Sequence, residues 1–118
     1  MPGFLTTHVL DTASGKPGAG MELELARLDG GGERRVVKTA RTNDDGRTDE
    51  PLLSEAEFEP GRYEIVFSVG EYFAGGPGVP DPPFLDRVPI RFGIADAEAH
   101  YHVPLLASPW SYSTYRGS

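Results

Sequence analysis

The sequence contains no cysteine, so it can form neither a disulfide framework nor a cysteine-based metal site. No apolar run approaches the length of a membrane span, and the opening MPGFLTTHVLD lacks a signal-peptide pattern. Basic residues are also scarce, with 11 Lys and Arg against 18 Asp and Glu and a net charge of −7. Nucleic acids and anionic membranes bind basic surfaces, so neither is an expected partner. These absences favour a cytoplasmic protein whose 118 residues (1–118) form one domain with its own core.

Glycine and proline, in contrast, are abundant, with 15 and 11 residues that separate short β-forming segments. Alternation is clearest in RYEIVFSV, where Tyr63, Ile65 and Phe67 share one face. Residues 70–75 are compatible with one helical turn, and the Pro- and Gly-rich residues 75–85 predict a loop. Further strands are predicted at residues 4–11, 21–28, 34–42, 87–95, 100–107 and 110–116, with Pro89 confining its strand to an edge or a bulge. This pattern predicts an all-β sandwich of two sheets.

A tight turn is predicted at NDDGR, residues 43–47, because Asp-Gly supplies a position with positive φ. We expect the side chains of Asp44 and Asp45 to cap this turn. Arg47 follows it directly, where strands end, and the guanidinium of such an arginine is suited to binding an anion.

Only three histidines are present, His8, His100 and His102. His100 and His102 are two residues apart, so on a strand both side chains project from the same face. Three interpretations remain open at this point. The histidines can be structural residues, they can ligate a metal through the His-x-His spacing, or one can act as an acid–base catalyst beside an arginine that binds an anion. Composition and periodicity do not choose among these interpretations.

Three separated stretches resemble one known family: LTTHVLDTASGKPG, TNDDGR and HYHVPLLASPWSYSTYRGS. The intervening GRYEIVFSVGEYFAG is similar to the strand and short helix of the same family. On these motifs the chain is identified as a member of the transthyretin-like family, in its 5-hydroxyisourate hydrolase branch. The closing YRGS is the tetrapeptide that separates the hydrolases from transthyretin, the hormone carrier.

The resemblance implies a transthyretin-like sandwich of two four-stranded sheets with one short helix. It also implies a homotetramer, a dimer of dimers around a central channel, with active sites at the dimer–dimer interface. The implied reaction is hydrolysis of 5-hydroxyisourate to 2-oxo-4-hydroxy-4-carboxy-5-ureidoimidazoline in urate degradation, with no cofactor or metal.

The matching motifs also imply the site residues. The catalytic set is His8, Arg47, His102 and Ser118, and the substrate-binding set is His8, Arg47, Tyr115 and Arg116. The two histidines are assigned to water activation and proton shuttling, and Arg47 to orienting the anionic ring. His100 receives no role. In transthyretin the positions of His8, Arg47, His102 and Tyr115 hold lysine, glutamate, threonine and threonine. This sequence has the hydrolase residue at all four positions. A non-catalytic transthyretin-like carrier is the alternative function, and a metal-dependent enzyme built on the three histidines is the third.

Overall fold

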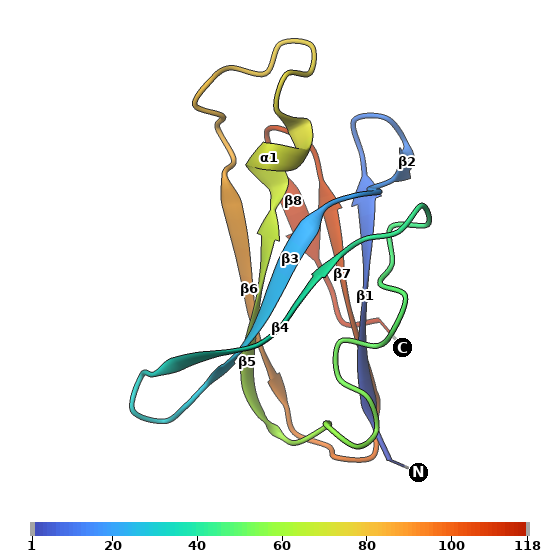
Figure 1. Ribbon diagram of the computed structural model, residues 1–118, viewed down its shortest axis with the longest axis vertical. Helices are drawn as coiled ribbons and strands as arrows, with labels where there is room; N and C mark the ends of the chain where they lie inside the picture. The colour runs from blue at the N-terminus through green and yellow to red at the C-terminus, as the bar shows by residue number, and fades with distance from the viewer. Residues whose placement is uncertain (1, 118) are drawn as a thin grey trace.

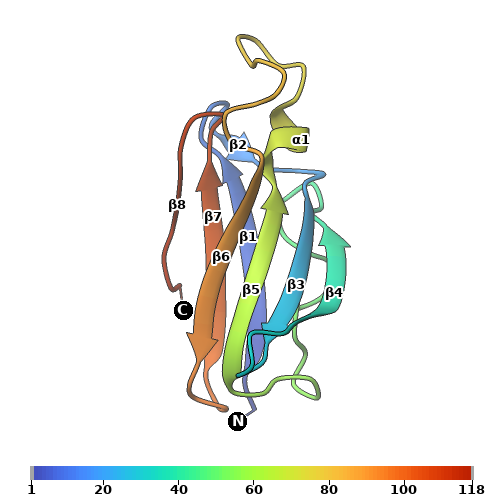
Figure 2. The same ribbon diagram turned by 90° about the vertical axis from the view of Figure 1, so that its left-hand side faces the viewer.

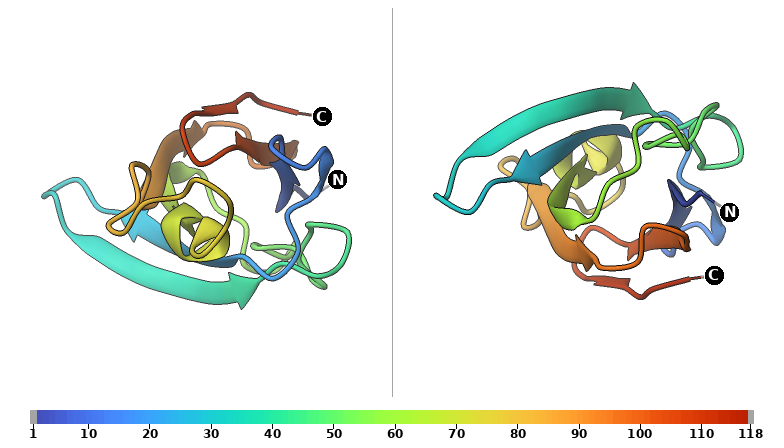
Figure 3. Two further views of the ribbon diagram at one scale, coloured as in Figure 1. Left: turned by 90° about the horizontal axis from the view of Figure 1, so that it is seen from above. Right: turned by 90° about the horizontal axis from the view of Figure 1, so that it is seen from below.

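In the computed structural model, which describes residues 2–117, eight strands and one short helix follow one another along the chain (Figure 1). They are β1 (Phe4–Asp11), β2 (Lys16–Pro17), β3 (Glu22–Leu28), β4 (Arg34–Arg41), β5 (Gly61–Ser68), α1 (Val69–Phe73), β6 (Arg87–Ile94), β7 (His100–Ala107) and β8 (Tyr112–Thr114). The strands form two four-stranded sheets, ordered β2-β1-β7-β8 and β4-β3-β5-β6. The sheets pack face to face, as Figures 2 and 3 show. The predicted sandwich with one short helix is therefore confirmed.

The core lies between the sheets and is built from alternate residues of each strand. In β1, Leu5 and Val9 are fully buried, whereas Thr6 and His8 lie on the outward face. In β5, Ile65 and Phe67 point inward as the alternation predicts. Because side chains on a strand alternate between two faces, one hydrophobic pattern fills the core and leaves the outer face of β1 and β7 for polar groups.

Two proline residues help to explain where the edge strands β6 and β8 lie and end. β6 lies at the edge of its sheet, so Pro89, which has no N–H to donate, costs no hydrogen bond to a further strand. β8 is shorter than the predicted 110–116. At its start the Ser108 hydroxyl accepts hydrogen bonds from the N–H groups of Trp110 and Ser111, both at 3.1 Å, which extends the turn. Past Thr114, the facing Pro104 of β7 has no N–H to continue the ladder.

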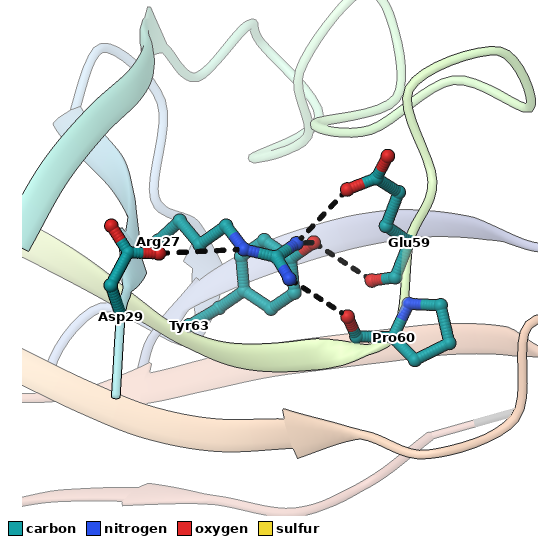
Figure 4. Close-up of polar contacts among 5 residues, drawn as sticks. All are labelled: Arg27, Asp29, Glu59, Pro60 and Tyr63. Atoms are coloured by element: carbon teal, nitrogen blue, oxygen red, sulfur yellow. Dashed lines mark hydrogen bonds and ion pairs between the residues drawn. The ribbon is translucent and has the colours of Figure 1, made fainter. Parts of the chain in front are cut away.

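Arg27, near the C-terminal end of β3, contacts the start of β5 and the residues just before it (Figure 4). Its guanidinium donates to the Tyr63 hydroxyl at 2.8 Å and to the carbonyl of Pro60 at 3.0 Å, and it pairs with Glu59 at 3.3 Å. These contacts tie β3 to the segment that leads into β5.

Candidate active site

All three histidines lie on the outward face of the two central strands of one sheet. β1 and β7 run parallel, and their register pairs Phe4 with His100, Thr6 with His102, and His8 with Pro104. His100 and His102 are half-buried and alternate with the buried Tyr101. The predicted common face of His100 and His102 is confirmed, and the fold brings His8 to the same face.

The Thr6 hydroxyl lies between the two neighbouring imidazoles of β7. Its Oγ1 is 2.7 Å from Nε2 of His100 and 2.8 Å from Nδ1 of His102. The Phe4 ring stacks on the His100 ring with a centroid distance of 4.1 Å and an interplanar angle of 10°. Both imidazoles are thus held by side chains of β1. Sequence reasoning missed Thr6 and Phe4, although alternation in β1 is a signal that places residues 4, 6 and 8 on one face.

Arg47 reaches this face because the turn that precedes it packs against β1. The Val9 N–H donates to the carbonyl of Gly46 at 2.7 Å, and the backbone of Arg47 pairs with that of His8. Gly46 has φ of 76°, and a Cβ there would collide with the Val9 carbonyl, so only glycine permits this docking. The turn is capped by Asn43, whose side-chain oxygen accepts from the N–H groups of residues 45 and 47 at 2.9 and 3.2 Å. Asp44 and Asp45 lie in this turn as predicted, but the side chain that caps it is that of Asn43.

A hollow of about 360 Å³ opens beside these groups, which is large enough for a small ring compound. Its lining includes Thr6, Arg47, His100 and His102. A second hollow of about 820 Å³ shares His100 and His102 and extends to the C-terminal segment. Arg47 and His102 therefore face one space. His8 does not line either hollow; its backbone pairs with that of Arg47.

The C-terminal segment returns along β7 and contacts His102. The Gly117 N–H donates to the carbonyl of His102 at 2.8 Å. A Cβ on Gly117 would lie 2.7 Å from Cδ2 of His102, which is well inside van der Waals contact. Only a residue without a side chain fits here while the imidazole keeps its position.

The other predicted tail residues lie differently. Tyr115 is 60% exposed and borders the second hollow. Arg116 also borders this hollow, but its guanidinium lies over the ring of Tyr101 at 4.2 Å from the centroid. Ser118 lies outside the described residues.

The surroundings of His102 favour its neutral form. Burial lowers the pKa of His102 below its ordinary value, and the positive charge of Arg47 and the other two histidines lower it further. At neutral pH this imidazole therefore has a nitrogen lone pair that can accept a proton.

Neither a metal cluster nor a membrane helix is found in the part of the chain that the structure describes. No group of three or more His, Cys, Asp or Glu side chains among residues 2–117 is arranged to hold a metal ion. Within the same residues, no helix has the length and apolar character needed to cross a bilayer.

Residues 5–117 match the HIUase/Transthyretin family. The chain is 62% identical to a 5-hydroxyisourate hydrolase of Mesorhizobium japonicum over 98% of its own length and 93% of that protein. Among solved structures it is similar to (S)-allantoin synthase, with a TM-score of 0.91 and 52% identity; the match covers 99% of this chain but 44% of that one. It is also similar to sea bream transthyretin in complex with thyroxine, with a TM-score of 0.85 and 25% identity over 96% of this chain and 93% of that one.

Proposed function

The chain belongs to the HIUase/transthyretin family, and on this premise we propose that it is an enzyme that hydrolyses 5-hydroxyisourate. The observation that carries the proposal is the shared hollow of Arg47 and His102, which joins an anion-binding group to a neutral imidazole. The names of relatives at 58% and 62% identity over nearly the full chain support the same substrate.

The proposed reaction opens the ring by attack of water on a carbonyl next to a ring nitrogen. His102 takes a proton from the attacking water, and the Arg47 guanidinium orients the planar anion and stabilises negative charge on the carbonyl oxygen. The carbon–nitrogen bond then breaks, and the leaving nitrogen receives a proton while the carbonyl carbon becomes a carboxylate. This gives 2-oxo-4-hydroxy-4-carboxy-5-ureidoimidazoline. Acid–base assistance of this kind is worth about 10²- to 10⁴-fold in rate.

The remaining roles are proposed from position. His8, adjoining Arg47, is assigned to proton shuttling and substrate contact. Tyr115 and Arg116 border the second hollow and are assigned to substrate binding, although the guanidinium of Arg116 is engaged by Tyr101. Ser118 lies outside the described residues, and the motif resemblance alone assigns it to the polar wall of the site.

The alternative is a carrier, because sea bream transthyretin in complex with thyroxine has the same fold. An assay separates the two functions: freshly generated 5-hydroxyisourate is followed by its ultraviolet decay with and without protein. We expect decay well above the spontaneous rate, and a rate equal to the spontaneous one would reject the hydrolase. Chelation before the assay tests the proposed independence of metal, and full activity is expected.

Two variants test the site against a matched control. His102→Asn removes the proposed base, and Arg47→Ala removes the proposed anion-binding group. Each should lose most of the activity, on the order of 10²-fold. Arg35→Ala deletes an exposed arginine of β4 away from the hollows and should retain it. Equal activity of Arg47→Ala and Arg35→Ala would reject the role of Arg47.

We further propose a homotetramer, a dimer of dimers, in the cytoplasm. The half-buried imidazoles and the wide second hollow lie on an outer sheet face of one chain, and a second chain over this face would close the site. Mass measurement in solution by light scattering tests the assembly, and cell fractionation tests the location.

A further inference from the structure

The hydroxyl of Thr6 joins two imidazoles whose protonation states are therefore linked. A hydroxyl has one proton to donate, and each neutral imidazole has one N–H and one lone pair. Oγ1 lies 2.7 Å from His100 Nε2 and 2.8 Å from His102 Nδ1, so both contacts are hydrogen bonds. Within residues 2–117 no third group bonds to this hydroxyl, so the hydroxyl donates its proton to one of the two nitrogens and accepts from the other.

Two arrangements then satisfy all three groups. In the first, His102 Nδ1–H donates to Thr6 and Thr6 donates to His100 Nε2, which leaves His102 Nε2 bare and able to act as a base. In the second, both bonds are reversed, and His102 carries its proton on Nε2, where it can act as an acid. The hydrogen bond made by one ring nitrogen decides the state of the other.

We propose that Thr6 is a positioning residue that couples His102 to His100, and that the three form a proton relay that converts His102 from base to acid between the two steps of ring opening. The relay rests on the proposed hydrolysis; the coupling of the two imidazoles does not.

The proton steps balance. When His102 Nε2 takes a proton from water, Nδ1–H passes its proton to Thr6 Oγ1, and the Thr6 proton passes to His100 Nε2. His102 is then neutral with Nε2–H, and the positive charge lies on His100. When Nε2–H goes to the leaving nitrogen, both transfers reverse, and the three groups return to their first state with no net gain or loss of protons.

The surroundings suit a charge at His100 better than one at His102. The face of the Phe4 ring lies parallel to His100 at 4.1 Å, which is within the range of cation–π attraction. His102, in contrast, is subject to the positive charge of Arg47, and burial also disfavours its cation. Movement of the charge from His102 to His100 places it against the face of the Phe4 ring.

The coupling is tested without substrate by long-range ¹H–¹⁵N NMR of the full chain carrying ¹⁵N-labelled histidine. In the wild type, at a pH where both rings are neutral, we expect one of His100 Nε2 and His102 Nδ1 to be protonated and the other bare. Thr6→Val removes the hydroxyl and keeps the β-branched shape, so the rings should become mixtures of tautomers. Thr6→Ser should restore the wild-type pattern. Two bare or two protonated nitrogens in the wild type would overturn the coupling.

Kinetics test the relay. Thr6→Val should lower kcat about tenfold or more, the rate equivalent of one hydrogen bond, with little change in KM. His100→Gln replaces the imidazole that receives the proton in the relay by an amide and should lower kcat similarly. Thr6→Ser should recover most of the rate.

Thr12→Val is the matched control, because the Thr12 hydroxyl donates to a β7 carbonyl at 3.1 Å but touches no imidazole. Unchanged kcat in Thr6→Val or in His100→Gln would overturn the relay. A wild type that adds nothing to spontaneous decay would reject the proposed hydrolysis and the relay, while the NMR result would still decide the coupling.

Discussion

Substitution of Gly117 by alanine tests the contact between the C-terminal segment and His102. The new Cβ would lie 2.7 Å from His102 Cδ2, about 0.7 Å inside ordinary contact at 3.4 Å. Either the imidazole or the chain must move by that amount. Movement of the imidazole stretches its 2.8 Å bond to Thr6, and movement of the chain weakens the 2.8 Å bond from the Gly117 N–H to the His102 carbonyl. A misplacement near 1 Å at a reacting group costs on the order of 10²-fold in rate, so we expect a loss of tens of fold in kcat.

The same change should leave stability almost intact, because no core side chain is lost and at most one hydrogen bond, worth about 1 kcal/mol, is weakened. The 5-hydroxyisourate decay assay gives kcat, and urea unfolding gives the free energy of unfolding. Gly31→Ala is the control, since a Cβ at this exposed hairpin residue meets nothing within 4 Å. If Gly117→Ala retains the kcat of Gly31→Ala, the close approach has no catalytic importance.

Two further predictions concern the same face. Arg47→Gln removes a positive charge that lowers the pKa of His102, so this pKa should rise toward its ordinary value. Protonated His102 cannot accept a proton, so the acidic limb of the kcat/KM profile should move to higher pH; an unmoved limb would show that Arg47 does not set it. Deletion of residues 116–118 should reduce activity by about 10²-fold or more while the free energy of unfolding changes little. If the free energy of unfolding instead falls by enough to explain the lost activity, this segment has only a structural role.

Much of the fold was predictable because its signals are local. Alternation in residues 62–69 and the Pro- and Gly-rich loop at 75–85 depend on neighbouring residues alone, and both agree with the structure. Glu64 shows the limit of such reasoning. Alternation places it on the outer face, yet it is only 5% exposed, because Arg34 and Arg91 of other strands donate to its carboxylate at 2.7 and 2.9 Å. Periodicity within one strand carries no information about partners on others.

The sequence predicted which residue types form the candidate site better than it predicted their contacts with one another. Spacing placed His100 and His102 on one face, and family motifs added His8 and Arg47. The contacts of Thr6 with His100 and His102 could not be predicted, because threonine is common in strands and these partners are 94 and 96 residues away in the sequence. The position of Arg116 was equally hidden, since its contact with Tyr101 depends on how the tail crosses the sandwich edge.

The parallel pairing of β1 with β7 also determines when the site can form during synthesis. Chains fold as they emerge, from the N-terminus onward, and long-range pairs form slowly. The sheet β4-β3-β5-β6 can be complete once Ile94 has emerged, whereas β1 must wait for a partner that begins at His100. A ribosome that stalls before that point therefore leaves β1 paired only with the short β2, and His8 without the other two imidazoles. The catalytic face is assembled late, from the first strand, β1, and the seventh, β7, which only β8 follows.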